Sequence, residues 1–542
     1  MSSSINIAAS LSIAAAERPA QLALISPGGI LTFRELEERS NRCAQGLRQM
    51  GIQRKTRTVL MVKPGIEFLV LAFALMKINS VLILIDPGIG RQNLKKCLED
   101  SKPEAFIGTP LAQSARILFG WARQTVQLCL TVGRFRLWRG PSLDQVMHLG
   151  GANLSFKSEP SANDDPAAIL FTSGSTGVPK GVVYTHGMFS AQARLLRDHF
   201  RIQPGEIDLA TFPLFALFDP ALGMTTVFPE MDFTRPGHVD PLEIINPIQR
   251  YKVTHMFGSP ALLDRVARYG ERHNIKLPTL RRVLSAGAPV PAKVLRHFSS
   301  LLEHDADIYT PYGATEALPV CSIAASEVSK ESGTGEGKGV CVGRPIPGVQ
   351  LAVIQISDEP IQTWSGDLLV PASEIGELVV WGPNVSREYF GRPEANDLAK
   401  IHGPQGEVRH RMGDLGYLDE RGRVWFCGRK SHRVITTQGP LFTVTCEGIF
   451  NQHPKVYRTA LVGVGPPPRQ RPVLCVELEK HSKNKWKGSR QLKQEILDLG
   501  ARHPLTKDIR TLLFHPSFPV DVRHNAKIFR EKLAVWAGEQ IS

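Results

Sequence analysis

The chain of 542 residues is 42% hydrophobic and 21% charged, which excludes a disordered chain, and its length exceeds that of one ordinary domain. The formal net charge of +14 favours anionic partners. The basic residues are scattered, however, and the densest run, 481–493, has no RNA-binding signature, so we expect no nucleic-acid binding. None of the eight cysteines forms a CxxC pair. This spacing argues against a disulfide framework or a zinc site and favours reduced thiols in a cytoplasmic protein.

Helical patterns alternate with short apolar runs near the start of the chain. Residues 33–50 and 68–76 have helical patterns, and the strand-like runs 58–62 and 81–85 follow them. Such alternation predicts an α/β fold with parallel layers. The longest apolar tract, 68–85, is interrupted by Lys77 and Asn79, so it predicts a helix and a buried strand, with no transmembrane segment. The N-terminus lacks a basic n-region and predicts a short helix, not a signal peptide.

A region richer in strands follows. Residues 376–381 and 424–427 have strand patterns, and 414–426 predicts a hairpin with its turn at 419–422. The pattern then restarts, with strands at 460–463, 473–478 and 512–516 and a helix at 492–499. We therefore predict a large N-terminal domain of layered sheets and helices over residues 1–428. A small, mobile C-terminal α+β domain would span residues 429–542.

The strongest chemical motif follows the apolar run 168–171. It consists of glycines, hydroxyl residues and one lysine, interrupted only by Val178 and Pro179; its other members are Thr172, Ser173, Gly174, Ser175, Thr176, Gly177, Lys180 and Gly181. Glycine lets the backbone approach a polyanion, successive N–H groups form an anion-binding nest, and the lysine adds charge. Pro179 precedes the lysine where a Walker A loop requires glycine. The loop therefore suits a triphosphate without being a Walker A loop. The alternative interpretation is an ordinary Gly/Ser turn that binds no ligand.

This loop resembles the signature loop of the adenylate-forming superfamily, which includes acyl-CoA synthetases, adenylation domains of peptide synthetases and luciferases. Further motifs follow in the family's order over nearly the whole chain. The resemblance implies an ATP-dependent, AMP-forming ligase that joins a carboxylic acid to AMP, releases pyrophosphate and uses Mg²⁺. It also implies rotation of the small domain between the steps.

The resemblance assigns roles to residues in five further motifs. Residues 285–289, with Gly287, Ala288 and Pro289, would line the adenine pocket, although any Gly/Ala turn after a strand would look the same. In the motif 312–316, Tyr312 would stack on adenine beside Gly313, Thr315 would contact the α-phosphate, and Glu316 would hold Mg²⁺, an ion suited to hard oxygen ligands. Taken alone, Glu316 would be a surface carboxylate.

Three residues nearer the C-terminus complete this set. The resemblance implies that Asp414 accepts the ribose hydroxyls and that Arg429 contacts ribose or phosphate. Lys527 would act as the catalytic lysine, bridging the substrate carboxylate and the α-phosphate. The alternatives are a strand-capping aspartate, a solvated hinge arginine and a surface lysine.

Several positions depart from the pattern of acyl-CoA ligases. Ser431 stands where Asp or Lys is usual, the segment 440–447 lacks the usual proline, and Ala216 replaces a frequent histidine. These changes put CoA transfer in doubt. The stretches 213–236, 410–430 and 519–536 resemble the β-lactone synthetases of the bacterial long-chain olefin pathway. That resemblance implies a β-hydroxy fatty acid substrate whose own hydroxyl displaces AMP, and it leaves room for assembly with other enzymes of a hydrocarbon pathway.

The acyl pocket is expected at 215–224 and 257–260. Phe215, Ala216, Phe218 and Gly258 are its candidate lining residues, with plain core packing an equal alternative for each. Asp219 would cap a turn or contact a substrate hydroxyl. Three functions remain open: lactone formation, ligation of a fatty acid to CoA or an acyl carrier, and nucleotide binding without catalysis. The retained motifs argue against the last.

Overall fold

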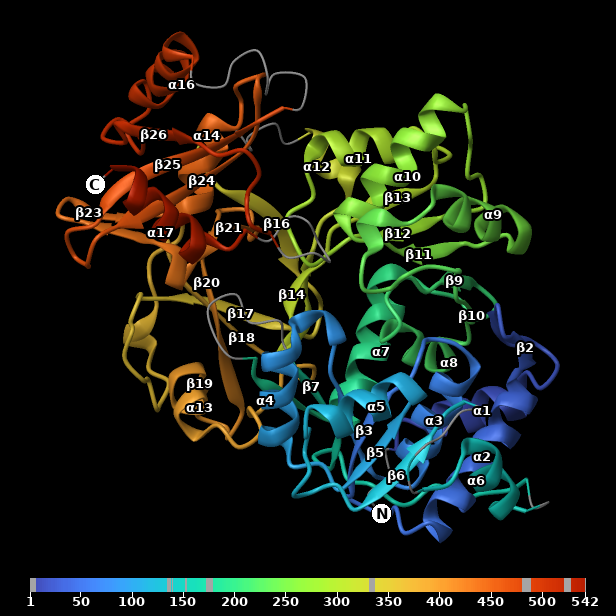
Figure 1. Ribbon diagram of the computed structural model, residues 1–542. Helices are drawn as coiled ribbons and strands as arrows, with labels where there is room; N and C mark the ends of the chain where they lie inside the picture. Colours follow the sequence, from blue (N-terminus) through green and yellow to red (C-terminus); the bar gives the residue numbers. More distant parts are fainter. Residues whose placement is uncertain are drawn as a thin grey trace.

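The computed structural model describes residues 6–133, 138, 140–151, 154–171, 179–330, 337–479, 489–520 and 528–541, without the side chains at positions 87, 329 and 330. In the N-terminal region, a pair of sheets encloses a layer of helices, and further helices cover the outer faces of the sheets (Figure 1). The predicted α/β class with layered sheets is confirmed.

The first sheet has the strand order β13-β12-β11-β9-β10-β1-β2. Its strands are β1 Leu22–Ser26, β2 Gly29–Thr32, β9 Ile207–Leu209, β10 Thr225–Val227, β11 His255–Phe257, β12 Arg282–Leu284 and β13 Asp307–Tyr309. All pairings are parallel except β1 with β2. One face packs against α9 (Pro241–Tyr251), α10 (Pro260–Arg272) and α11 (Ala292–Ser299) through a shared apolar cluster.

The second sheet has the order β6-β5-β3-β4-β7-β8. Its strands are β3 Arg57–Met61, β4 Val81–Leu84, β5 Ala105–Gly108, β6 Leu128–Thr131, β7 Pro166–Phe171 and β8 Gly181–Thr185. Its outer face carries α4 (Arg91–Ser101) and α5 (Pro110–Leu118). Only β8 is antiparallel to its neighbour, because β7 and β8 form the hairpin that carries the 172–181 loop.

The layer between the sheets consists of helices that share one apolar cluster. Its members are α1 Ala9–Glu17, α2 Phe33–Gln49, α3 Ile66–Lys77, α6 Leu143–Leu149, α7 His186–Phe200 and α8 Asp219–Leu222. From Phe68 onward α3 is buried on every side, which explains its unbroken apolar sequence. The buried Lys77 ammonium contacts Glu37 at 2.6 Å. The apolar tract 68–85 is thus a helix followed by a buried strand, as predicted, and no helix among the described residues is long and apolar enough to cross a bilayer.

A third, antiparallel sheet lies against these layers. Its strands are β14 Tyr312–Ala314, β15 Ala317–Ser322, β16 Val340–Pro345, β17 Gln350–Ile354, β18 Gly376–Trp381, β19 Lys400–His402, β20 Val408–Leu418 and β21 Val424–Arg429, and its helices are α12 Ala325–Lys330 and α13 Pro393–Ala399. The predicted hairpin is β20–β21. Its turn is fixed by Asp419, which accepts from two backbone N–H groups, and by Gly422 at φ +70°.

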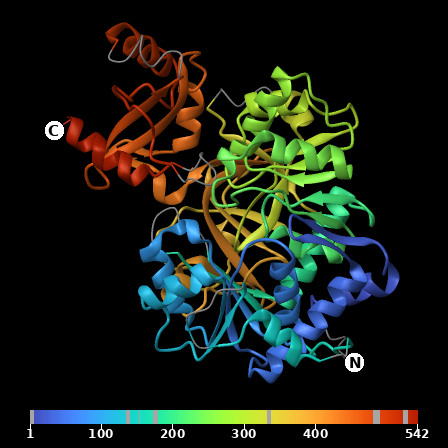
Figure 2. The ribbon, with the colours of Figure 1, turned by 45° about the vertical axis from the view of Figure 1, so that its right-hand side comes forward.

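The C-terminal region stands apart from the layers (Figure 2). It contains β22 Val434–Thr436, β23 Gly439–Leu441, β24 Val456–Val464, β25 Arg471–Leu478 and β26 Thr511–Phe514, with α14 Thr443–Phe450, α16 Arg490–Ala501 and α17 Arg530–Ile541. Short 3-10 segments elsewhere are Pro87–Ile89, Phe215–Leu217, Pro236–His238, Gly366–Leu368 and Lys430–His432. The larger and smaller regions match the predicted architecture, while the division at residue 428 stays a prediction.

Two ion pairs tie the start of this C-terminal region to the third sheet. Lys430 Nζ donates to the Ser357 carbonyl at 2.7 Å and lies 3.1 Å from Glu377 Oε2, and Arg433 pairs with Asp358. Glu377 Oε2 also accepts from Arg411 Nη2 at 2.6 Å. The junction is therefore held by charge as well as by the chain itself.

Candidate active site

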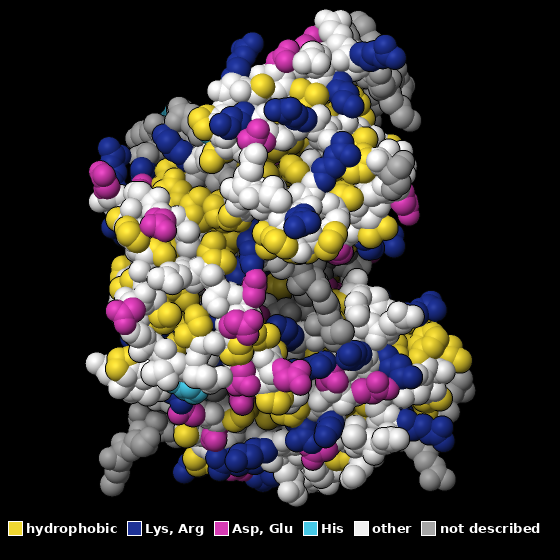
Figure 3. Space-filling view, turned by 90° about the vertical axis from the view of Figure 1, so that its left-hand side faces the viewer, with side chains coloured by type: hydrophobic (Ala, Val, Ile, Leu, Met, Phe, Trp, Pro, Cys, Tyr) yellow, Lys and Arg dark blue, Asp and Glu magenta, His cyan; other side chains and the backbone are white. Residues whose placement is uncertain are grey.

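A cavity of 2160 Å³ extends from the third sheet into the helical layer. It is lined at one end by residues of the predicted nucleotide motifs and elsewhere by aromatic and aliphatic side chains. Figure 3 shows the molecule hollowed between its upper and lower portions, with charged side chains near the opening. The polar end of the cavity is described first, because it contains most of the predicted site residues.

Asp414 and its neighbours form one wall of the polar end. β20 places Asp414, which is 3% exposed, opposite Arg429 on β21. The Tyr312 hydroxyl donates to Asp414 Oδ2 at 2.6 Å, and Arg429 Nε lies 3.1 Å from Oδ1. Oδ1 accepts no hydrogen bond from the described residues. Burial raises the pKa of Asp414, and the nearby Arg429 opposes that rise. This buried carboxylate thus retains an acceptor atom for a ligand hydroxyl.

Glu316 lies beside this wall and is held by a tyrosine. The Tyr389 hydroxyl donates to Glu316 Oε1 at 2.7 Å. Two ammonium groups lie near the Tyr389 ring: Lys180 Nζ is 4.8 Å and Lys400 Nζ 5.3 Å from its centroid. Burial lowers the pKa of Lys400 to about 7, even though Glu316 favours its charged form. The glutamate proposed for Mg²⁺ and the lysine of the phosphate loop therefore contact the same aromatic ring.

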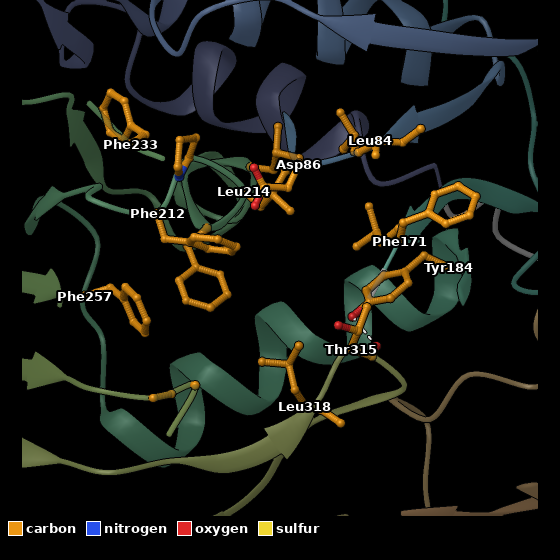
Figure 4. Close-up of a pocket in the computed structure, with 18 of the residues that line it drawn as sticks. Leu84, Asp86, Phe171, Tyr184, Phe212, Leu214, Phe233, Phe257, Thr315 and Leu318 are labelled. Carbon is orange, nitrogen blue, oxygen red and sulfur yellow. Dashed lines mark hydrogen bonds between the residues drawn. The ribbon is translucent and has the colours of Figure 1, made fainter. Parts of the chain in front are cut away.

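The backbone around Glu316 is fixed as well. The Ser386 N–H donates to the Glu316 carbonyl at 2.8 Å, and Lys400 Nζ donates to the Ser386 carbonyl at 2.6 Å. The Tyr184 hydroxyl donates to the Thr315 carbonyl at 2.7 Å, a contact drawn in Figure 4. The motif 312–316 thus presents its side chains from a strand pair whose main chain is anchored from two sides.

The apolar limb of the cavity begins a short distance from Thr315. Figure 4 shows Phe212, Phe257 and Phe233 on the far side of the cavity from Tyr184 and Thr315. Phe215 packs edge-on against Phe257 with ring centroids 4.9 Å apart. Such a lining provides the apolar surface that an alkyl chain needs.

The first sheet carries a row of buried polar side chains that faces the cavity. Thr226, Asp208 and His255 are adjacent in register on β10, β9 and β11. Asp208 Oδ1 lies 2.6 Å from His255 Nδ1, and the Thr226 hydroxyl donates to Asp219 Oδ2 at 2.6 Å. Burial, followed by the charge of Asp208, raises the pKa of Asp219 well above its usual value. The Asp219 carboxyl therefore bonds across to β10 and contributes to a partly polar floor of the cavity instead of capping a turn.

The sequence-predicted residues fall into three groups. Those that line the cavity are Lys180, Gly287, Tyr312, Gly313, Thr315, Glu316, Arg429, Phe215 and Phe218, with Asp414 bonded directly to Tyr312. Thr172, Ser173, Gly174, Ser175, Thr176, Gly177 and Lys527 lie outside the described residues. Ala288, Pro289, Ala216 and Gly258 do not belong to the described lining.

The reason differs among the residues of this last group. Ala216 is fully buried in the core layer, because the 3-10 turn at Phe215–Leu217 points it away from the cavity while Phe215 faces it. Gly258 packs tightly against α10, where an added Cβ would lie 2.5 Å from Leu263 Cδ2. Ala288 and Pro289 follow Gly287 on the way to α11, beyond the wall of the cavity. The apolar lining is therefore supplied by Phe215 and its aromatic neighbours.

Sequence reasoning missed Tyr389, Lys400 and Tyr184. Tyr184 lies on β8 three residues after Gly181, and the first four residues of that strand are all buried, so the local pattern indicated only a core position. Lys400 reaches the site because β19 pairs with β20, with Lys400 opposite His410. That pairing depends on tertiary register, which no local pattern records.

Comparisons with known proteins agree with this site. A family model described as AMP-binding enzyme matches residues 11–390. The chain is 48% identical to an olefin beta-lactone synthetase of Xanthomonas campestris pv. campestris, over 100% of this chain and 99% of the relative. It is 46% identical to the protein of the same name from Stenotrophomonas maltophilia, over 99% and 98%.

Solved structures share the fold at low sequence identity. ATP-bound MatB from Rhodopseudomonas palustris superposes with a TM-score of 0.79 at 22% identity, covering 99% of this chain and 100% of that one. The anthranilate CoA ligase AuaEII, in complex with anthranoyl-AMP, gives a TM-score of 0.79 at 19% identity, over 99% and 98%. With the family model and the two close relatives, these findings show that the chain belongs to the AMP-binding, adenylate-forming enzymes, which are ATP-dependent and AMP-forming ligases.

Proposed function

We propose that this enzyme activates a long-chain β-hydroxy fatty acid as its acyl-adenylate and then closes the acid to a β-lactone. One observation carries the proposal: a single cavity joins the polar corner of Arg429 and Glu316, with Asp414 paired to Arg429 directly behind it, to a limb lined by Phe212 and Phe257. The identity of 48% with an olefin beta-lactone synthetase over the whole chain supports the second step.

The polar corner suits AMP. The free acceptor atom of Asp414 fits a ribose hydroxyl, and Arg429 provides charge for the phosphate beside it. Glu316 offers the hard oxygen ligand that Mg²⁺ prefers, and Mg²⁺ usually takes only one or two protein carboxylates together with phosphate oxygens. When bound there, Mg²⁺ would neutralise charge on the phosphates. Lys180 would add positive charge from the phosphate loop, and we assign the same task to Lys527.

In the first step an oxygen of the substrate carboxylate attacks the α-phosphorus, the bond to the β-phosphate breaks, and pyrophosphate leaves. Catalysis here consists of positioning and charge neutralisation. In the second step the β-hydroxyl oxygen attacks the acyl carbon, the acyl–phosphate bond breaks, and AMP leaves as the hydroxyl proton is released to solvent. The product is a four-membered lactone, so no thiol is required.

A product assay tests the proposal. The purified chain is incubated with ATP, Mg²⁺ and a long-chain β-hydroxy acid, with and without CoA, and AMP and lipid products are followed by mass spectrometry. The matched 3-deoxy acid serves as substrate control, since it can be adenylated but cannot cyclise.

We expect AMP and a β-lactone from the hydroxy acid without CoA, and no lactone from the deoxy acid. Formation of acyl-CoA only when CoA is present would make the enzyme a fatty acid–CoA ligase. Absence of AMP with every acid tried would contradict the assignment of the polar corner as well.

A further inference from the structure

Helix α5 has an inverted distribution of polarity. Its exposed side carries Leu111, Ile117 and Leu118, which are 80%, 52% and 76% exposed. Its buried side includes Gln113, which is 0% exposed and whose amide donates to the carbonyls of Phe106 and Leu130 at 3.3 and 3.0 Å. An amphipathic surface helix normally shows the opposite arrangement.

The exposed residues form a stripe that is broader at one end. Leu111 and Leu118 are seven positions apart and share one helix face, while Ile117, about 100° around the helix from Leu118, widens the exposed apolar surface at the C-terminal end of α5. The packing of α5 on β5 and β6 needs none of them, because Gln113 and Ala112 make that contact. Contiguous exposed apolar side chains on one element indicate an interaction surface more often than scattered ones do.

The surroundings of this stripe are basic. The sequence contains no Asp or Glu from residue 105 to residue 143, while it contains Arg116 in α5 and Arg123 shortly after it. Among the described residues, Arg123 and Arg91 are exposed, and the Arg91 guanidinium lies 5.1 Å from the ring centroid of Phe119, directly after α5.

The acidic residues of the neighbouring helix α4 are paired. Glu99 lies 3.8 Å from Lys95, and Asp100 pairs with Arg392. Lys96 is exposed on the same helix. The charge near the stripe is therefore positive, and it complements an anionic surface.

The stripe also borders the cavity. Leu111 is both strongly exposed and included in the cavity lining, together with Ala112, Ala115 and Trp121. Long-chain fatty acids partition into bilayers, so a mouth that faces lipid would receive the substrate without passage through water. This last step rests on the proposed function, while the surface itself does not.

We propose that the α5 patch, defined as Leu111, Ile117 and Leu118 with Arg91 and Arg123, docks the enzyme on an anionic lipid bilayer. The apolar side chains enter the headgroup region, and the arginines contact anionic headgroups. Neither contribution is large alone, so the attachment is peripheral and weakens with salt.

Vesicle sedimentation tests this proposal without any substrate. The full chain is mixed with vesicles of phosphatidylcholine alone or with vesicles that also contain about 30% phosphatidylglycerol. The second set carries the negative surface charge of an anionic leaflet. The variant Ile117→Ser/Leu118→Ser is compared with Ile13→Ser/Val535→Ser, which removes two exposed apolar side chains elsewhere (57% and 66% exposed). AMP affinity, measured by calorimetry, checks that each variant is folded.

We expect the wild type and the control variant to bind anionic vesicles and the α5 variant to bind at least about tenfold more weakly, because it loses two of the apolar side chains that enter the headgroup region. Failure of the wild type to bind anionic vesicles overturns the proposal, as does equal binding by both variants. Loss of a complex with a second protein in the α5 variant, with vesicle binding unchanged, would make the patch a protein interface instead. None of these outcomes depends on the lactone assay.

Discussion

The Tyr389 hydroxyl donates a hydrogen bond to Glu316 Oε1 at 2.7 Å, and this contact orients the carboxylate proposed for Mg²⁺. The variant Tyr389→Phe keeps the ring that contacts Lys180 and Lys400 but removes the donor. A hydrogen bond to a charged group contributes about 1.5–3 kcal/mol, so we expect AMP formation to fall roughly tenfold to a hundredfold. The measurement is the rate of AMP formation against Mg²⁺ concentration.

Tyr417→Phe is the matched control, because Tyr417 stacks on Trp425 with ring planes 3° apart, away from Glu316. Equal rates in the two variants would show that the Tyr389 hydroxyl does not position Glu316.

Lys400 should make the stability of the protein depend on pH. Burial lowers the pKa of Lys400 from 10.5 to about 7, so between these values the unfolded chain binds a proton that the folded chain does not. Stability from this group therefore rises as pH increases from about 7 to about 10, by at most ~1.4 kcal/mol per pH unit. Lys400→Met should remove that rise, as measured by urea unfolding at pH 7, 8 and 9.

The exposed Lys96 provides the comparison, and Lys96→Met should retain the wild-type slope. Parallel pH profiles for wild type and Lys400→Met would mean that the Lys400 ammonium is solvated or fully compensated by Glu316.

Asp414 should determine nucleotide affinity. The asparagine of Asp414→Asn has nearly the same shape as the aspartate. It replaces either Oδ1 or Oδ2 by an amide nitrogen and removes the negative charge opposite Arg429. We expect the Kd for AMP to increase about tenfold to a hundredfold, the equivalent of one or two charged hydrogen bonds. Calorimetry with AMP alone measures this without Mg²⁺ or acid.

Asp367→Asn, in an exposed 3-10 turn, changes charge by the same amount away from the cavity. An AMP affinity equal to wild type in Asp414→Asn would remove the ribose role from this residue.

Lys527 should be needed for the chemical steps more than for nucleotide binding. Lys527 lies outside the described residues, but Arg530, three residues later, is anchored by Glu447, with Nη2 2.9 Å from Oε2. Loss of one preorganised charge donor typically costs about a hundredfold to a thousandfold in rate, which is our expectation for Lys527→Ala. Acyl-adenylate formation is measured by pyrophosphate exchange.

Lys532→Ala, on α17, tests a lysine of the same segment whose ammonium lies 4.8 Å from the Phe529 ring centroid. Undiminished exchange in Lys527→Ala would assign the catalytic charge to another residue, of which Lys180 would be the first to examine.

The sequence predicted elements well where local pattern and burial agree. The hairpin β20–β21 was evident from Asp419 and Gly422, and the helix–strand pair α3–β4 from its two apolar runs. The glycine-rich loop was recognised because its residue types are chemically distinctive at short spacing, whereas the role of Glu316 came from the resemblance to the adenylate-forming family, since a lone glutamate carries no such signal.

Contacts that depend on tertiary register could not be predicted in this way. Lys400 resembles any surface lysine until β19 pairs with β20 and buries it to 4% exposure. Ala216 was placed in the pocket because its segment is apolar, yet a 3-10 turn rotates successive residues by about 120°, which sends Phe215 and Ala216 to different surroundings.

Glu377 accepts from Arg411 within the third sheet and from Lys430 at the start of the C-terminal region. If the small domain rotates about this junction and Lys430 withdraws, Arg411 still neutralises the buried carboxylate, so no uncompensated charge is left behind. Opening would also break the Arg433–Asp358 pair, but the Asp358 side chain is 64% exposed and would be hydrated. The second partner of Glu377 thus lowers the cost of the rotation that the family resemblance implies.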